Sequence, residues 1–250
     1  MESLPFSLWM LVAVGVLGIA ATTALALYRG AGPRPAATRL AVLVGGGWLI
    51  WIVVSAVLAG SGAYRQSTTQ TRPWIGVAAG AALAVALLAA RHPAVRRTLT
   101  DPGADARLTW PHTFRVVGVV FGIAMLLGKL PAVFAVPAGL GDIAVGLAAP
   151  FIARRLARGD RRGAVLFHTL GLVDLLVAVS IGFLAALGPA RLLDVSPSTQ
   201  SIALLPLVLV PTTAVPLLIG LHLVSLARFR AGRPTTAGAG PVRLPATPVS

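Results

Sequence analysis

The chain has 250 residues, of which 56% are hydrophobic and only seven are acidic, against 21 lysines and arginines and no cysteine. A mean hydropathy of +0.86 excludes a water-soluble globule, because too few polar residues remain to cover a water-facing surface. The absence of cysteine excludes disulfides, iron–sulfur ligation and thiol catalysis. The net charge of +14 comes from arginines between hydrophobic stretches and not from a basic face interleaved with aromatics, so we expect no nucleic acid partner.

Seven apolar stretches are long enough to cross a bilayer, which takes about 20 residues. Inside the hydrocarbon each backbone N–H and C=O must be paired within its own segment, so stretches this long and without alternation must be helices. The sequence therefore predicts an all-α, multi-pass transmembrane bundle of seven helices. The predicted spans are Leu4–Tyr28, Leu40–Leu58, Pro73–Ala90, Pro111–Gly128, Pro131–Ile152, Ala164–Leu187 and Ser201–Leu226.

Charge in the loops predicts the orientation of this bundle. The loops on one side contain nearly all of the arginines, whereas those on the other side contain only Arg65, Arg72, Lys129 and Arg191. Because cytoplasmic loops retain positive charge, we expect the amino terminus outside and the carboxyl terminus in the cytoplasm. The expected partners are the lipid bilayer and the anionic lipids of its inner leaflet.

Composition also predicts where the protein is located and how the chain divides into domains. The preference for arginine over lysine, with abundant alanine, valine, glycine and proline, indicates a GC-rich bacterial genome and hence a bacterial inner (plasma) membrane. Residues 1–227 are predicted to form one transmembrane domain. Residues 228–250 are rich in Pro, Gly, Ala and Thr, cannot bury enough surface to become ordered, and are predicted to be a disordered basic cytoplasmic tail.

Two aspartates are predicted to lie near the middle of the membrane. Asp142 is roughly 16 Å inside the fifth span and Asp174 roughly 15 Å inside the sixth, and the two spans run in opposite directions. A carboxylate at the centre of a helix costs on the order of 3 kcal/mol to insert, so such residues usually face the bundle or a wet cavity. If the two faces meet, we expect the pair to share one proton. The alternative is that each aspartate only holds two helices together.

The fourth and seventh spans supply further polar residues. Arg115 is on a stripe of the fourth span together with Gly118 and Gly122, and its side chain has two options: to extend toward an aspartate, or to turn back to the cytoplasmic surface. In the seventh span Thr212 and Thr213 follow a proline, which removes a backbone hydrogen bond and frees a carbonyl for a hydroxyl, water or an ion. We predict a proton or substrate site made by Asp142, Asp174, Arg115, Thr212 and Thr213.

Three histidines, His112, His168 and His222, are expected in the cytoplasmic third of the fourth, sixth and seventh spans. Because histidine titrates near neutrality, they are candidates for a proton path to the aspartates. Each is also consistent with an ordinary hydrogen-bonding residue near a span end. No two of them have the i, i+3 or i, i+4 spacing of ligands on one helix, so we predict no metal site, and nothing in the sequence indicates a cofactor.

The residues Gly139-Leu140-Gly141-Asp142 resemble the GxGD signature of intramembrane aspartyl proteases, the group of presenilin, signal peptide peptidase and the prepilin peptidases. The resemblance implies that Asp142 is one of two catalytic carboxylates, with Asp174 as its partner. In that group, however, the partner aspartate precedes the GxGD span, whereas Asp174 follows it. The last span also lacks the Pro-Ala-Leu triplet.

Three functions remain open from the sequence. The first is a small proton-linked transporter or permease that carries a small solute or a proton. The second is a membrane accessory or scaffold protein without transport activity, and the third is the intramembrane protease. A retinal protein is excluded because the only lysine, Lys129, is not in the last span. Motifs of soluble hydrolases, nucleotide-binding enzymes and zinc proteases are also lacking, which favours a protein that is not an enzyme.

Overall fold

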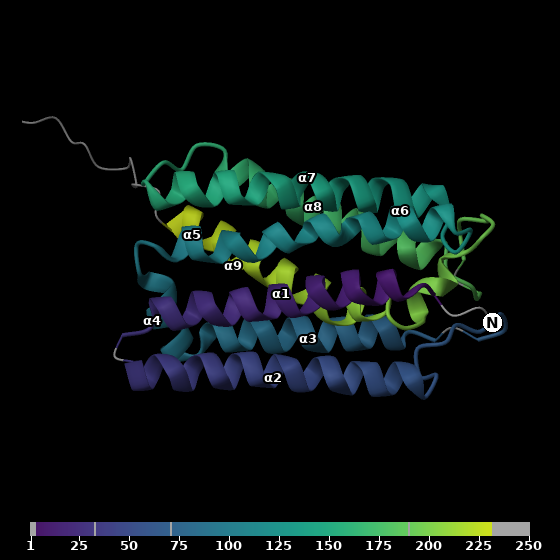
Figure 1. The fold of residues 1–250 in the computed structure, drawn as a ribbon, viewed down its shortest axis with the longest axis horizontal. Helices are drawn as coiled ribbons and strands as arrows, with labels where there is room; N and C mark the ends of the chain where they lie inside the picture. Colours follow the sequence, from purple (N-terminus) through teal and green to yellow (C-terminus); the bar gives the residue numbers. More distant parts are fainter. Residues whose placement is uncertain (1–3, 33, 71, 190, 232–250) are drawn as a thin grey trace, which may run out of the picture.

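The computed structural model describes residues 4–32, 34–70, 72–189 and 191–231. Its helices lie side by side along the long axis of the molecule (Figure 1). Seven of the described segments are helical, long and apolar enough to cross a membrane, which confirms the all-α, seven-helix fold class. In chain order the elements are α1 Phe6–Gly30, α2 Arg34–Gly60, α3 Trp74–Arg91, α4 Pro93–Thr100, α5 Ala104–Thr109, η1 Trp110–Gly118, α6 Val119–Leu126, α7 Ala132–Ala157, α8 Ala164–Leu184, η2 Thr199–Ala203, η3 Val210–Ala214 and α9 Val215–Ala231.

The fourth span is a composite helix that packs between the two halves of the bundle. It consists of α5, η1 and α6, and its η1 segment lies against α7 on one side and α1 on the other. The helix α1 also packs against α2, α7 packs against α8, and α9 packs against both α3 and α8. The main hydrophobic core is therefore shared by residues of the first, fourth, sixth and seventh spans, such as Val16, Val120, Leu175 and Leu218.

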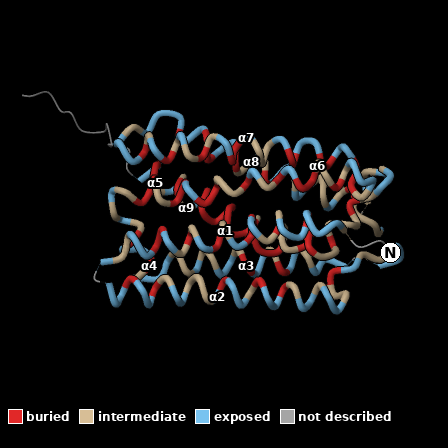
Figure 2. Tube along the Cα trace, viewed as in Figure 1, coloured by how far each residue is buried: buried red, intermediate tan, exposed pale blue. Residues whose placement is uncertain are grey.

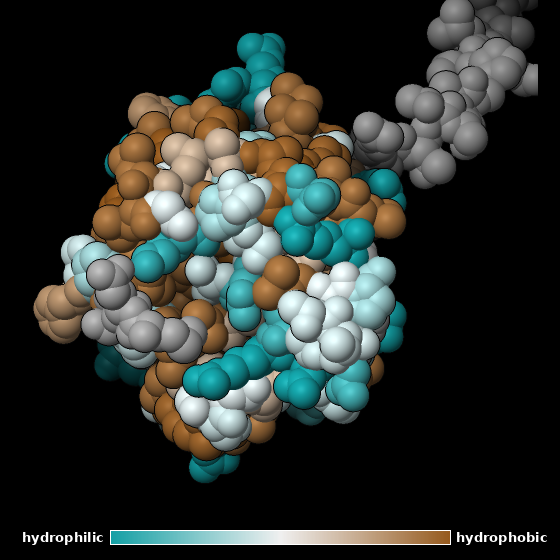
Figure 3. All heavy atoms as spheres, turned by 90° about the vertical axis from the view of Figure 1, so that its right-hand side faces the viewer, coloured by the Kyte–Doolittle hydropathy of each residue, from teal (hydrophilic) through white to brown (hydrophobic). Residues whose placement is uncertain are grey.

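Burial follows this packing. The buried residues lie on the sides of the helices that face the middle of the molecule, and exposed residues cover the outer sides (Figure 2). Many of the exposed side chains are large and apolar, including Leu43 and Ile50 on α2 and Leu166 on α8. Seen from the end where α1 begins, hydrophilic residues gather over the middle of the surface and hydrophobic residues form most of its outline (Figure 3). An apolar flank with polar ends is the surface that a lipid bilayer requires.

We name the two ends of the bundle by their charge. The arginine-rich end comprises the described residues 29–40, 91–107, 154–164 and 226–231, and it lies at the left in Figure 1. The arginine-poor end is the opposite end, where α1 begins. The segregation of arginine that the sequence shows is thus preserved in the fold.

The fourth span begins seven residues earlier than its predicted start at Pro111, because α5 begins at Ala104. The polar residues Asp105 and Arg107 argued against a helix inside the membrane at this point. Both are satisfied at the arginine-rich end, since Asp105 binds two arginines and Arg107 binds Asp101 at 3.0 Å. Ion pairs with residues distant in the sequence thus allow the helix to begin earlier than hydropathy alone predicts.

A turn at Asp101-Pro102-Gly103 follows the short helix α4. The backbone N–H of Gly103 donates to the Asp101 carboxylate at 2.7 Å. This hydrogen bond lowers the pKa of Asp101, and Arg107 contributes in the same direction. The turn fixes the angle at which the chain leaves α4 and enters the fourth span.

The seventh span differs most from its prediction. It was expected over Ser201–Leu226, but the long helix begins with η3 at Val210 and α9 continues to Ala231. Before it lie the short helix η2 and a stretch of turns around Pro206, because proline at this position and at Pro211 removes backbone donors. Residues 228–231, predicted as the start of the tail, are helical, and the rest of the tail, 232–250, lies outside the described residues.

Candidate polar site in the membrane interior

Arg115 lies between the two aspartates in the interior of the bundle. Its Nε donates to Asp142 Oδ1 at 2.7 Å, and its Nη2 donates to Asp174 Oδ2. The Arg115 side chain is 1% exposed, whereas those of Asp142 and Asp174 are 14% and 19% exposed. Both carboxylates therefore lie at one depth, and the arginine extends toward them instead of toward the membrane surface. We call these three residues the carboxylate–arginine cluster.

The cluster differs from the expected pair of aspartates that share a proton. Because a guanidinium only donates hydrogen bonds and is always charged, it binds an acceptor oxygen of each aspartate and stabilises the carboxylate form of both. With all three groups ionised, two negative charges and one positive charge leave a net charge of −1 inside the bundle. The third guanidinium nitrogen, Nη1, donates to the Gly171 carbonyl at 3.1 Å.

Glycines make the cluster sterically possible. A Cβ atom on Gly118 would collide with Asp142, and one on Gly141 would collide with the Asp174 carboxylate. On α8, a Cβ on Gly171 would come within 2.6 Å of the His222 ring. The predicted small-residue faces of α7 and α8 are thus the surfaces that bring the charged groups into contact.

A cavity connects the cluster with the arginine-poor end. It has a volume of about 200 Å³ and reaches from Gln66, Arg72 and Arg191 at the end of the bundle down to Asp142. Its walls are mostly apolar and come from α3, α6, α7, α8, η2 and η3. The one acidic residue that lines this cavity in the described chain is Asp142, which makes it the member of the cluster open to solutes from this end.

Thr212 and Thr213 form hydrogen bonds to backbone carbonyls at the irregular start of the seventh span. The hydroxyl of Thr212 donates to the Val208 carbonyl at 2.7 Å, and that of Thr213 donates to the Leu209 carbonyl. Thr212 also exchanges a hydrogen bond of 2.7 Å with Ser55 on α2. In the part of the chain that the structure describes, these hydroxyls contact α2 and their own helix and not the carboxylates.

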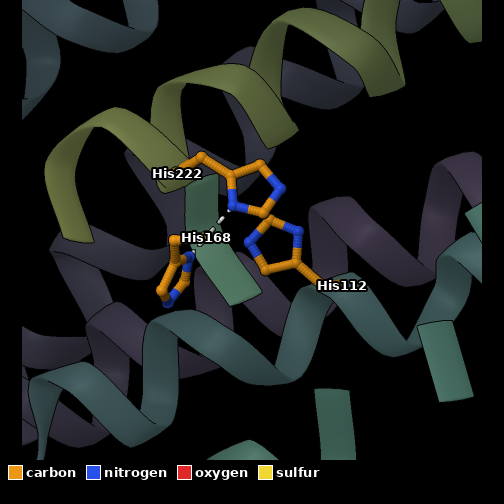
Figure 4. A group of neighbouring side chains, drawn as sticks. All are labelled: His112, His168 and His222. Atoms are coloured by element: carbon orange, nitrogen blue, oxygen red, sulfur yellow. Dashed lines mark hydrogen bonds between the residues drawn. The ribbon is translucent and has the colours of Figure 1, made fainter. Parts of the chain in front are cut away.

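The three predicted histidines come together from three helices (Figure 4), and Nε2 of His222 lies 3.2 Å from Nη1 of Arg115 in the cluster. His112 is on η1, His168 on α8 and His222 on α9, and all three are fully buried. The rings of His112 and His222 are stacked with centroids 3.9 Å apart, and His168 meets both edge-on. The prediction of a histidine group rested on depth alone, and the packing of three different helices now places the rings in contact.

Hydrogen bonds fix the protonation pattern of two histidines. Arg115 Nη1 lies 3.2 Å from His222 Nε2 and can only donate, so Nε2 accepts and the neutral ring carries its proton on Nδ1. His222 Nδ1 then donates to His168 Nδ1 at 2.9 Å, which leaves the His168 proton on Nε2. His168 Nε2 donates in turn to the Thr109 hydroxyl at 3.4 Å, and Thr109 donates to the Asp105 carbonyl at 2.8 Å.

The result is a continuous chain of hydrogen bonds from the carboxylate–arginine cluster toward the arginine-rich end. We call it the histidine chain, defined by His222, His168 and Thr109. His112 is not part of it, because neither of its ring nitrogens has a hydrogen-bond partner among the described residues. This departs from the prediction, in which all three histidines lay on one path.

The prediction of no metal site rested on the spacing of ligands along one helix, whereas the three histidines come from three helices. One ring nitrogen each of His112, His168 and His222 lies within 4.8 Å of the others. A metal on His222 Nδ1 would need the ring proton on Nε2, where it would face a guanidinium N–H at 3.2 Å. In the arrangement that the structure shows, His222 Nδ1 is instead engaged in the hydrogen bond to His168.

Asp105 closes the arginine-rich end beyond the histidine chain. It is buried and accepts from Arg161 at 3.0 Å and from Arg228 at 2.6 Å, so it joins the α7–α8 loop and the end of α9 to the start of α5. We expect Asp105→Asn to lower the free energy of unfolding by about 1–3 kcal/mol, because both arginines lose a charged acceptor. Thermal unfolding in detergent micelles measures this, with Asp194→Asn, at an aspartate whose side chain is 97% exposed, as the control. An equal midpoint for the two variants would contradict the expectation.

The fold and the buried charges together define a multi-pass membrane protein with a polar site in its interior. The chain belongs to the family described as a domain of unknown function (DUF8737), whose profile matches residues 72–230. The matched segment begins just before α3 and contains the whole carboxylate–arginine cluster and all three histidines. No curated protein and no solved structure matches the chain.

Proposed function

We propose that this protein is a small proton-linked transporter of the bacterial inner membrane, with the amino terminus outside and Asp142 as its proton-binding group. One observation carries the proposal: a buried cluster of two carboxyl groups and one arginine lies between a cavity from one end and a hydrogen-bonded chain toward the other. Secondary transporters have their coupling sites near the midplane of the membrane, at interrupted helices. Here the interruptions are η1 in the fourth span and η3 in the seventh.

Proton binding changes the charge of the cluster. When Asp142 takes up a proton from the cavity, the cluster becomes neutral, because Asp174 and Arg115 still balance one another. The hydrogen bond from Arg115 Nε to Asp142 then no longer joins two opposite charges, so the contact between α7 and η1 weakens. A neutral cluster also lowers the cost of moving these helices through a low-dielectric interior. Proton binding and helix movement are coupled by the same ion pair.

The structure has the form of a state open to one end only. The cavity reaches Asp142 from the arginine-poor end, while Asp105 with Arg161 and Arg228 closes the arginine-rich end. In the proposed orientation this is an outward-open state. The inward-open state requires that the ion pairs of Asp105 separate and that the histidine chain becomes accessible from the cytoplasm.

The geometry disfavours the protease. A catalytic dyad needs one carboxyl group that is protonated and a water between the two, whereas Arg115 occupies the position between Asp142 and Asp174. The glycines of the GxGD sequence have packing roles, since Gly139 lies against the Gly118 carbonyl and Gly141 leaves room for Asp174. If the protein is a scaffold, the cluster contributes to stability alone. Transport measurements distinguish this alternative from the transporter.

Asp142→Asn is the decisive variant, because asparagine keeps a hydrogen-bond acceptor for Arg115 and loses the titrating group. We expect proteoliposomes with entrapped pyranine and an imposed pH gradient to acidify faster when the transported solute is added from a panel of small organic and inorganic solutes. The variant should not respond to the same solute. Asp194→Asn, which removes an exposed carboxylate from a loop, serves as the control. A folded Asp142→Asn protein that acidifies at the wild-type rate would overturn the assignment.

A further inference from the structure

A larger cavity lies between α1, α2, α3, α4 and α9 in the half of the bundle next to the arginine-rich end. It has a volume of about 1020 Å³ and almost entirely apolar walls. The helix α3 lines it from Ala81 to Ala90, a length of roughly 14 Å, which is about half of a hydrocarbon core roughly 30 Å thick. Along α2 the lining extends further, from Pro35 to Val54, or roughly 28 Å. We call this cavity the α2–α3 cleft.

Small residues keep this cleft open. Ala82 and Ala86 on α3 and Gly220 on α9 form one wall. On the opposite wall a Cβ atom added to Gly47 of α2 would meet no atom within 4 Å. Because α2 packs against α1 and α3 packs against α9, the space between the two pairs is not filled by side chains of the bundle. Exposed apolar residues such as Leu43, Ile50 and Leu88 also line it, so the cleft is open at the flank of the bundle and accessible to an apolar chain from the bilayer.

Among the described residues Arg39 is the one arginine or lysine that lines the cleft, and it lies at the arginine-rich end, as does His92. Arg39 on α2 is exposed, and His92 precedes α4. The Nδ1 atom of His92 accepts from the Ala94 N–H at 3.3 Å, so its Nε2 remains available as a donor. No acidic side chain of the described residues lines the cleft. Its opening at the arginine-rich end therefore attracts an anion.

We propose that the α2–α3 cleft is a binding site for one phospholipid with a negatively charged headgroup. An acyl chain lies along the apolar walls, and the phosphate binds Arg39 and His92. The combination of long apolar walls with an arginine at only one end matches the chemistry of such a lipid. The site is separate from the carboxylate–arginine cluster and does not depend on the transport proposal.

Native mass spectrometry of the full chain, with phosphatidylglycerol or phosphatidylcholine added at equal concentration, tests this site. We expect one phosphatidylglycerol molecule to remain bound at least tenfold more strongly than phosphatidylcholine. Arg39→Gln should remove this preference, whereas Arg96→Gln, the same loss of charge outside the cleft, should keep it. Gly47→Leu should reduce binding of both lipids, and the matched Gly46→Leu, which also points into open space but does not line the cleft, should not.

Three results would overturn the proposal. The first is equal binding of the two lipids by the wild-type chain. The second is unchanged lipid binding by a Gly47→Leu protein with the helical circular dichroism of the wild type. The third is a change from dimer to monomer in Gly47→Leu without a change in lipid binding, because the cleft would then be an interface between two copies of the chain.

Discussion

Arg115→Leu is expected to destabilise this protein more than any other single substitution of a charged residue. It leaves two carboxylates buried beside each other without a counter-charge, in addition to three lost hydrogen-bond donors. Removing one partner of a buried ion pair costs about 3–5 kcal/mol, and the remaining like charges add to that cost. Unfolding in mixed micelles with increasing sodium dodecyl sulfate measures the change in the free energy of unfolding.

Compensating substitutions test whether the uncompensated buried charge causes the loss of stability in Arg115→Leu. If the loss comes from the uncompensated charge, then Asp142→Asn and Asp174→Asn combined with Arg115→Leu should recover much of the stability. The control is Arg155→Leu, which removes a half-exposed arginine from a surface ion pair with Asp160 and should change stability little. Equal stability of Arg115→Leu and Arg155→Leu would mean that the cluster contributes nothing to the fold.

Gly146→Ala is expected to separate α7 from the fourth span. A Cβ atom at this position would lie 2.5 Å from the backbone N of Val116 and 3.1 Å from the carbonyl carbon of Arg115, and backbone atoms cannot turn aside as a flexible side chain can. Overpacking of this kind costs about 1–3 kcal/mol. Because the displaced segment holds Arg115, we also expect the ion pairs with both aspartates to lengthen.

The matched control for this substitution is Gly122→Ala on α6, in the same span. A Cβ at Gly122 would meet no atom within 4 Å, so alanine should raise the free energy of unfolding by about 0.5–1 kcal/mol through its higher helix propensity. The two variants are thus expected to shift the thermal midpoint in opposite directions. A stabilised Gly146→Ala protein would contradict the close packing of α7 on η1.

Most of the secondary structure could be predicted because the bilayer leaves few choices. Uninterrupted apolar length predicted α1, α3 and the start of α8 to within two residues of their observed positions. The errors occurred where polar residues or prolines interrupt the apolar pattern. Asp105 is inside a helix because two distant arginines bind it, and the stretch before Val210 is irregular because its prolines remove donors.

The amino-acid sequence by itself determined the number of spans, the segregation of arginine and the depth of Asp142 and Asp174, since these depend on composition and on the rise of a helix. Only the tertiary structure decided which side chains face one another. Rotation about each helix axis depends on packing, and packing placed Arg115 between the aspartates, turned the Thr212 hydroxyl toward α2 and brought histidines of three helices into contact. These contacts join residues up to 157 positions apart, a separation at which local sequence patterns contain no information about orientation.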